Sequence, residues 1–240
     1  MPVIAIVGAG AGMGRAIAKT FGSHGFRVAL LSREPAHLEP IVRELAEERI
    51  ESAAFRVDVL DRPSIGSGLA MVNRHFGFID VLEYSPSATV SPLASATELN
   101  YDNVQGWIEF LVHGAVAAVN HVLPEMVARG TGSILFTTGA SSVYPAPMFG
   151  NVGPAAACLR NWAQALHHAV APQGVQVAHV AIGAFLGRQP GATPDAVAPL
   201  YWDLHTKRDQ FERIFMPEAV SWLPGSVAQS SPPSVSDPSV

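Results

Sequence analysis

The sequence is short of cysteine, of positive charge and of long apolar runs. Cys158 is its single cysteine, which excludes an intramolecular disulfide and a cysteine-rich metal site. Lysine and arginine together number 15 against 20 for aspartate and glutamate, so the formal net charge is −5. Nucleic acids and membrane surfaces are bound by basic patches, and we therefore expect a partner of neither kind.

The first residues, MPVIAIVGAG, contain no basic leader, and their apolar run has the length of a strand. We therefore expect a cytoplasmic protein. His167, His168 and His179 do not group with cysteine or carboxylate residues at the spacing of metal ligands, so no metal site is predicted.

Apolar segments of strand length alternate with longer segments of helical periodicity from residue 3 onward. The strands are continuous apolar runs, which is typical of a parallel sheet covered on both faces. This alternation predicts one doubly wound, Rossmann-like α/β domain over residues 1–216. We expect strands at residues 3–8, 26–32, 52–59, 78–85, 133–139 and 175–183, and helices at residues 12–23, 35–49, 103–129, 151–171 and 193–215, with a further helix capped by Asp61. The Ser/Pro-rich segment 217–240 has no periodic apolar pattern and is predicted to be a disordered tail.

The first predicted strand leads through VGAGAGMGRAIA into the first predicted helix. Glycines at such a turn let the backbone approach a phosphate, and the helix N-terminus offers N–H groups with a partial positive charge. Gly8, Gly12 and Gly14 fit the spacing G-x-x-x-G-x-G, with Met13 between the last two. The turn is therefore a candidate site for a dinucleotide pyrophosphate.

This glycine spacing, followed in order by FRVALLSRE, RVDV, FGFIDVL and GSILFTT, resembles the short-chain dehydrogenase/reductase family. The resemblance runs from residue 2 to about residue 187. It implies a dinucleotide-binding oxidoreductase whose partner is a small-molecule substrate.

The resemblance also indicates which dinucleotide is bound. In the family, an acidic side chain after the second strand bonds the adenosine ribose of NAD. Ser32 and Arg33 occupy this place, and a guanidinium suits the 2′-phosphate, so NADP is the expected cofactor. Asp58 and Val59 match the positions that flank the adenine.

The residues that carry the family's chemistry are missing from the matching positions. In the family, a tyrosine supplies a proton to a ketone, a lysine lowers the pKa of that tyrosine, a serine polarises the carbonyl and an asparagine anchors a water relay. The positions of the tyrosine, lysine, serine and asparagine hold, respectively, Val152, Ala156, Gly139 and Leu111. None of the four tyrosines is followed by a lysine four residues later. We therefore expect no simple ketone reduction by the family mechanism.

Tyr84, Ser141 and Tyr144 are the polar residues expected nearest to the nicotinamide, and they are candidates for a catalytic part. The alternative is that Tyr84 packs and bonds the backbone, Ser141 forms a turn and Tyr144 anchors a loop. We expect an apolar pocket lined by Leu111, Val152, Phe185 and Trp202.

The family's closing strand, with its Asp-Gly-Gly, has no counterpart after Phe215. We therefore expect the last strand of the sheet to be missing. Assembly into a homodimer is expected through the helices at residues 103–129 and 151–171.

Three functions remain open at this point. The first is an atypical NADP(H)-dependent oxidoreductase that reduces an activated double bond or an iminium. The second is a catalytically inactive NADP-binding sensor or partner subunit. The third is a cyclase, isomerase or dehydratase that uses the same pocket without redox chemistry. The fold alone does not choose among them.

Overall fold

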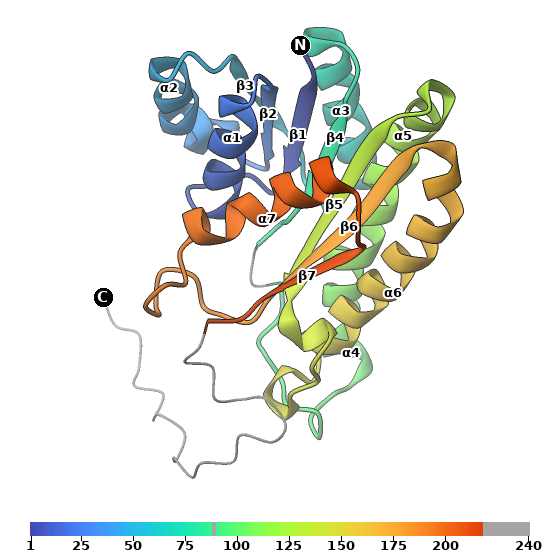
Figure 1. The fold of residues 1–240 in the computed structure, drawn as a ribbon. Coiled ribbons are helices and arrows are strands. Elements are labelled where there is room, and N and C mark those ends of the chain that lie inside the picture. The colour runs from blue at the N-terminus through green and yellow to red at the C-terminus, as the bar shows by residue number, and fades with distance from the viewer. Residues whose placement is uncertain (88–89, 218–240) are drawn as a thin grey trace.

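The computed structural model describes residues 1–87 and 90–217, and these residues form a doubly wound α/β domain (Figure 1). Seven parallel strands lie in the order β3-β2-β1-β4-β5-β6-β7. The strands are β1 (Val3–Val7), β2 (Arg27–Ser32), β3 (Ser52–Arg56), β4 (Val81–Tyr84), β5 (Gly132–Gly139), β6 (Val175–Ile182) and β7 (Glu212–Phe215). The predicted fold class is confirmed.

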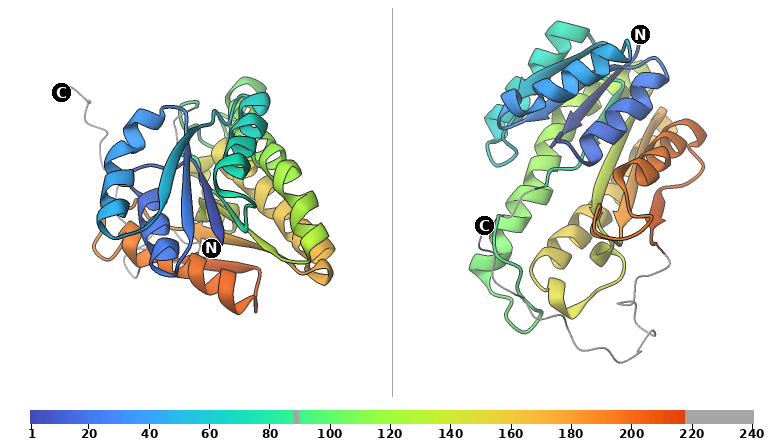
Figure 2. Two further views of the ribbon diagram at one scale, coloured as in Figure 1. Left: turned by 90° about the horizontal axis from the view of Figure 1, so that it is seen from above. Right: turned by 90° about the vertical axis from the view of Figure 1, so that its left-hand side faces the viewer.

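Helices cover both faces of this sheet (Figure 2). One apolar core lies between the sheet and α3, α5 and α6, and the other between the sheet and α1, α2 and α7. All five residues of β1 are buried, as a strand covered from both sides requires. The helices are α1 (Met13–Ser23), α2 (Glu39–Glu47), α3 (Arg62–Phe76), α4 (Tyr101–Trp107), α5 (Gly114–Arg129), α6 (Val152–Val170) and α7 (Pro194–Lys207).

A π-helical segment, Ile108–His113, joins α4 to α5. Within it the Phe110 carbonyl accepts a hydrogen bond from the Tyr84 hydroxyl at 2.7 Å. Gly114 follows, and a Cβ there would approach that hydroxyl to 2.2 Å, so the helix lies against Tyr84 because residue 114 has no side chain. The whole stretch Tyr101–Arg129 is long and apolar enough to cross a membrane by composition, but α5 packs on the sheet with Ala115, Ala118 and Val119 in the core.

Two predictions at the C-terminal end are wrong. The last predicted helix, 193–215, ends at Lys207, where Arg208 takes a left-handed conformation with φ of 51°. The closing strand, predicted to be missing, is present as β7, which pairs with β6. A physical reason is visible in Glu212, which Arg160 of α6 and His179 of β6 hold at this edge of the sheet. Residues 218–240, nearly all of the predicted tail, lie outside the described residues.

Candidate functional site

Two adjoining cavities open at the carboxyl ends of the strands, beside the point where the strand order reverses between β1 and β4. This is where doubly wound sheets bind their ligands. The main cavity has a volume of about 770 Å³ and the side cavity about 370 Å³. They share the lining residues Gly8, Ala9, Gly10, Pro86, Ser87 and Phe110. Together they are large enough for an extended cofactor and a small substrate.

The glycine turn forms the junction of the two cavities. Gly8 has a positive φ of 92°, and a Cβ there would lie 2.3 Å from the Pro86 backbone, so the turn requires glycine. A Cβ on Gly14 would lie 2.7 Å from the Ala9 backbone, and this glycine therefore lets α1 pack closely. At Gly10 and Gly12 a Cβ would meet no atom within 4 Å. Packing therefore does not require glycine at these two places, and the backbone there is open to the cavities.

The start of α1 is open to an anion. Gly12 is its N-cap, no side chain caps the first turn, and the first turn contains no acidic residue. Gly12, Met13 and Gly14 all line the main cavity. The N-terminus of this 11-residue helix therefore lies at the cavity, where the sequence predicts a pyrophosphate site.

The side cavity carries the expected specificity residues. Ser32, Arg33 and Val59 line it, and so do Glu34 and His37, which the sequence analysis did not single out. Arg33 is exposed, and Nε2 of the exposed His37 lies 3.2 Å from a carboxylate oxygen of Glu34.

Asp58 lies beside the side cavity without being among its lining residues. Its Oδ1 accepts a hydrogen bond from the Leu60 backbone at 3.1 Å, and its own N–H donates to Ser64. The structure therefore shows Asp58 ordering the turn that follows β3.

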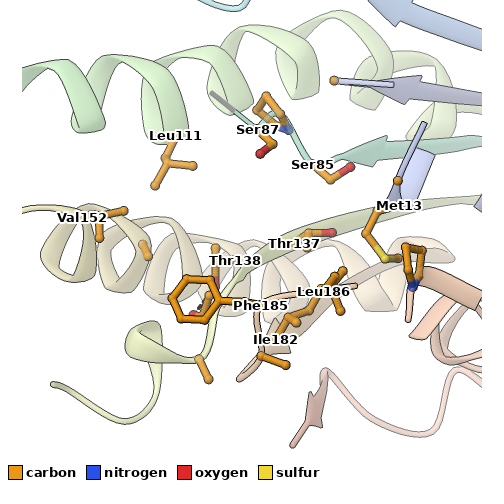
Figure 3. A pocket seen from close by; sticks show the side chains of 18 of the residues that line it. Met13, Ser85, Ser87, Leu111, Thr137, Thr138, Val152, Ile182, Phe185 and Leu186 are labelled. Atoms are coloured by element: carbon orange, nitrogen blue, oxygen red, sulfur yellow. Dashed lines mark hydrogen bonds between the residues drawn. The ribbon is translucent and has the colours of Figure 1, made fainter. Parts of the chain in front are cut away.

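The far wall of the main cavity is apolar (Figure 3). The four positions at which the family resemblance expects catalytic residues all line it, namely Leu111, Gly139, Val152 and Ala156. Leu111 and Val152 face each other across the cavity, with Phe185 on the near side.

The prediction that Trp202 lines the pocket is wrong. Trp202 stacks on His24 of α1 with ring centroids 3.8 Å apart and meets Phe21 edge to face. It packs there because α7 lies against α1, on the face of the sheet that holds the second core.

The three candidate polar residues lie in different surroundings. Ser141 lines the main cavity and is nearly buried. Tyr84 is fully buried, its hydroxyl donates to the Phe110 carbonyl, and burial raises the pKa of its phenol well above the usual range. Tyr144 is half-buried in the loop after β5 and is not among the lining residues of the main cavity.

A buried carboxyl group lies directly behind the floor of the main cavity. Glu83 is fully buried in β4, where Ser85 donates to it at 2.8 Å and Thr137 at 3.0 Å. The Thr137 hydroxyl also lies 2.6 Å from the hydroxyl of Tyr201, which α7 supplies. Burial raises the pKa of the Glu83 carboxyl to about 8, although both hydroxyls oppose this by donating to it. Ser85 and Thr137 both line the cavity, and Figure 3 shows their side chains near each other.

A second buried array reaches the cavity at Thr138. The Thr138 hydroxyl lies 2.8 Å from Nε2 of His179, whose Nδ1 lies 2.8 Å from Glu212. The carboxylate only accepts, so Nδ1 carries the proton and Nε2 accepts from Thr138. Burial lowers the pKa of His179, and Arg160 pairs with Glu212 through two hydrogen bonds. Although burial opposes ionisation, the bonds from His179 and Arg160 lower the pKa of Glu212 to about 2.

Sequence reasoning missed both arrays, although a signal was present. Glu83 and His179 are ionisable residues inside buried, mainly apolar strands, VLEY and VQVAHVAI. A polar side chain inside a buried strand requires a partner. Ser85 lies two residues from Glu83, but the other partners lie 33 to 54 residues away along the chain. Within the described ranges, 1–87 and 90–217, no group of three metal-ligating residues occurs.

Comparison with known proteins agrees with this architecture. The family model of short chain dehydrogenases matches residues 2–190. An uncharacterised oxidoreductase of Staphylococcus epidermidis is 26% identical over 181 residues, which cover 75% of this chain and 76% of that protein.

Solved structures show the same fold. A short-chain dehydrogenase from Rhodopseudomonas palustris superposes with a TM-score of 0.78 at 26% identity, covering 90% of this chain and 98% of that one. A short-chain oxidoreductase from Pseudomonas aeruginosa, solved with NADPH and described as containing an atypical catalytic centre, gives 0.80 at 18% identity, covering 89% and 94%. Since the family model spans most of the sequence, this protein belongs to the short-chain dehydrogenase family of oxidoreductases.

Proposed function

We propose that this protein is an NADP(H)-dependent oxidoreductase that works without the tyrosine and lysine of its family. The observation that carries the proposal is the wall formed by Leu111, Gly139, Val152 and Ala156, whose side chains include no tyrosine, lysine, serine or asparagine to act in the family mechanism. When bound, NADPH would supply a hydride. Loss of a general acid costs about 10²–10⁴ in rate. The substrate is therefore an activated double bond or an iminium, whose electrophilic carbon does not depend on a strong acid.

The residues present fit a dinucleotide. Gly10 and Gly12 leave open space exactly where a side chain would stand between backbone and ligand, and the uncapped start of α1 faces the same space. The pyrophosphate would be held there. The adenosine end would then extend along the side cavity toward Arg33, and the reactive end along the main cavity toward Ser85 and Val152.

NADP rather than NAD is supported by charge. Arg33 is an exposed guanidinium at the end of β2 that suits a 2′-phosphate, and His37 lies in the same cavity. Glu34 also lines this cavity, and its carboxylate lies 3.2 Å from Nε2 of His37. The Pseudomonas aeruginosa oxidoreductase with the same fold binds NADPH, which adds support to this choice.

Calorimetric titration with NADPH, NADP⁺ and NADH tests the proposal, followed by assays of NADPH oxidation with electron-poor alkenes and iminium compounds. Micromolar binding of NADPH, weaker binding of NADH and turnover with one of these substrate classes are expected. Binding with no turnover across both classes would favour a non-catalytic NADP sensor. Absence of dinucleotide binding would overturn the proposal.

A second candidate is favoured by one observation, the array Thr138–His179–Glu212. It resembles a general-base relay that ends at the wall of the cavity. Such an array suits an isomerase or a dehydratase. Turnover of a substrate in the absence of dinucleotide, lost in Thr138→Val, would select this function.

We further propose a cytoplasmic homodimer that pairs through α5 and α6. The long apolar stretch Tyr101–Arg129 is only 44% buried over its most apolar window, and such a surface favours a protein partner. Cys158 of α6 is exposed. Light scattering should give the dimer mass for the parent protein and a monomer for Cys158→Arg.

A further inference from the structure

Glu83 is an unusual residue for the centre of a parallel sheet. It is fully buried, between Ile6 of β1 and Leu135 of β5 in the register of the strands. Its described partners are the hydroxyls of Ser85 and Thr137. Burial of a carboxylate without a cation is costly, so such a group keeps its proton near neutral pH.

The two hydroxyls that contact Glu83 differ in what else they contact. Thr137 is held on the inner side by Tyr201, at 2.6 Å, as well as by Glu83. The Ser85 hydroxyl donates to Glu83 and has no other hydrogen-bond partner among the described residues. Ser85 is half-buried, lines the main cavity, and directly follows β4, where its N–H donates to the carbonyl of Val7 beside the glycine turn. The Ser85 hydroxyl therefore connects the Glu83 carboxyl group to the cavity.

We infer that Glu83 stores a proton for this site, delivers it to a bound substrate through the Ser85 hydroxyl, and remains as a carboxylate that offsets the positive charge of oxidised nicotinamide. This inference rests on the proposed function, because it requires a nicotinamide dinucleotide in the main cavity. Glu83 acts through Ser85, and it is a positioning residue rather than one that touches the substrate.

The step balances in atoms and electrons. For an activated double bond, the bound cofactor would supply a hydride to the electrophilic carbon, and Ser85 would donate a proton to the atom that receives the displaced electron pair. The Ser85 hydroxyl, which donates to Glu83 at 2.8 Å in the structure, would turn its hydrogen toward the substrate and accept the proton of Glu83 across the same contact. Glu83 ends ionised next to an oxidised cofactor, so the neutral pair of protonated acid and reduced ring becomes a pair of opposite charges. After the cofactor leaves, water in the cavity returns the proton through Ser85.

The side chains that face Glu83 carry no positive charge, so a bound nicotinamide ring would be the cation that pairs with ionised Glu83. The residues facing it from β4, β5 and α7 are Ser85, Thr137 and Tyr201. Tyr201 is the titratable one among them, and its pKa is raised well above its usual value by burial and then by Glu83. No ion pair in the described part of the chain includes Glu83.

A consequence for cofactor binding follows by linkage. The Glu83 pKa of about 8 falls when a positive ring binds nearby, so NADP⁺ binding releases a proton at neutral pH while NADPH binding does not. Below pH 8 the affinity for NADP⁺ should therefore rise with pH, by up to about tenfold per unit, relative to that for NADPH. Both forms carry the same 2′-phosphate, and its own titration cancels in the ratio.

The experiment is calorimetric titration of the full-length protein with NADP⁺ and NADPH from pH 6 to 9, in two buffers of different ionisation enthalpy. The parent protein should release a larger fraction of a proton with NADP⁺ than with NADPH. Glu83→Gln, which keeps the shape of the side chain, should abolish this difference and make the affinity ratio independent of pH. Glu47→Gln, at an exposed glutamate of α2, should behave like the parent protein.

Ser85→Ala separates charge storage from a structural role. Removing a hydroxyl that donates to Glu83 should move the midpoint of proton release to higher pH, since that bond lowers the Glu83 pKa. Equal proton release in the parent and Glu83→Gln, with both dinucleotides bound, would overturn the inference and leave the proposed function standing. If neither dinucleotide binds, the proposed function fails, and the inference fails with it.

Discussion

The two halves of the site present their chemistry in opposite ways. The nucleotide half offers its groups directly, through the bare backbone at Gly10 and Gly12 and the exposed side chain of Arg33. The reactive half presents an apolar wall, and its ionisable groups, Glu83 and His179, are fully buried one layer behind it. Under the proposed function, dinucleotide recognition would depend on surface charge and backbone, and proton transfer would depend on the hydroxyls that connect the cavity to the interior.

The largest expected effect concerns stability at the reactive half. Burial raises the pKa of the Glu83 carboxyl in the folded protein to about 8, from an ordinary value of 4.5. A raised pKa in the folded state stabilises the protein fully below pH 4.5, and this contribution is lost as the pH rises to 8. Glu83→Gln should remove this pH-dependent loss of stability. At pH 8.5 its free energy of unfolding should therefore exceed that of the parent by on the order of 4 kcal/mol. Urea unfolding at pH 5, 7 and 8.5 measures it.

The same unfolding series on Glu47→Gln supplies the control, because that exposed side chain should leave the pH dependence of the parent unchanged. If the parent and Glu83→Gln lose stability in parallel from pH 5 to 8.5, then Glu83 is already ionised in the folded state. The contrast between an open and a buried half would then lose its main support.

The second effect concerns the nucleotide half. Gly10→Asp should lower the affinity for NADPH by about a hundredfold, roughly 3 kcal/mol, because a carboxylate would stand where the backbone faces the pyrophosphate. Since a Cβ at this position meets no atom within 4 Å, the thermal unfolding of the unliganded protein should hardly change. Calorimetry and thermal melts on the same samples test this. A large loss of stability would show that Gly10 serves packing instead.

The fold could be predicted from local patterns because its strands and helices are regular and long. Buried runs such as VIAIV and the glycine turn each carry their own signal. The short strand Glu212–Phe215 does not, because ERIF continues the mixture of charged and aromatic residues of α7. Only its pairing with β6 and the Arg160–Glu212 contact make it a strand.

The candidate site was predictable at its backbone but not in its interior. The glycine spacing marks the turn, and Arg33 follows a strand end. The Glu83 array joins residues 54 and 64 positions apart along the chain, and no periodicity in one sequence reports such contacts. Trp202 was misplaced for a related reason, because its helix packs on α1 rather than over the cavity.

A smaller effect should separate the two dinucleotides. Arg33→Ala should weaken NADPH binding about tenfold to thirtyfold, since a hydrogen bond to a charged group contributes about 1.5–3 kcal/mol in favourable settings. NADH, which lacks the 2′-phosphate, should bind this variant and the parent equally. Arg43→Ala, at another exposed arginine outside both cavities, is the matched control. Equal weakening of NADPH and NADH by Arg33→Ala would contradict a role in recognising the phosphate.

The smallest expected effect is that restoring two of the family residues does not create ketone reductase activity. The double variant Val152→Tyr with Ala156→Lys restores the family's pair at two cavity-lining positions, yet it should reduce a panel of ketones no faster than the parent. Gly139 still supplies no hydroxyl to polarise the carbonyl, Leu111 supplies no amide, and Ala156 is 1% exposed, so a lysine there is desolvated.

Adding Gly139→Ser and Leu111→Asn to the double variant makes this comparison sharper. A Cβ at Gly139 would meet only the Ser141 hydroxyl, at an ordinary 3.6 Å, so the cavity has room for the serine. Ketone reduction by the quadruple variant, absent in the double variant, would show that the reactive half lost its chemistry as a set of side chains on an intact scaffold. Robust reduction by the double variant alone would show that the apolar wall departs from the family less than its four positions indicate.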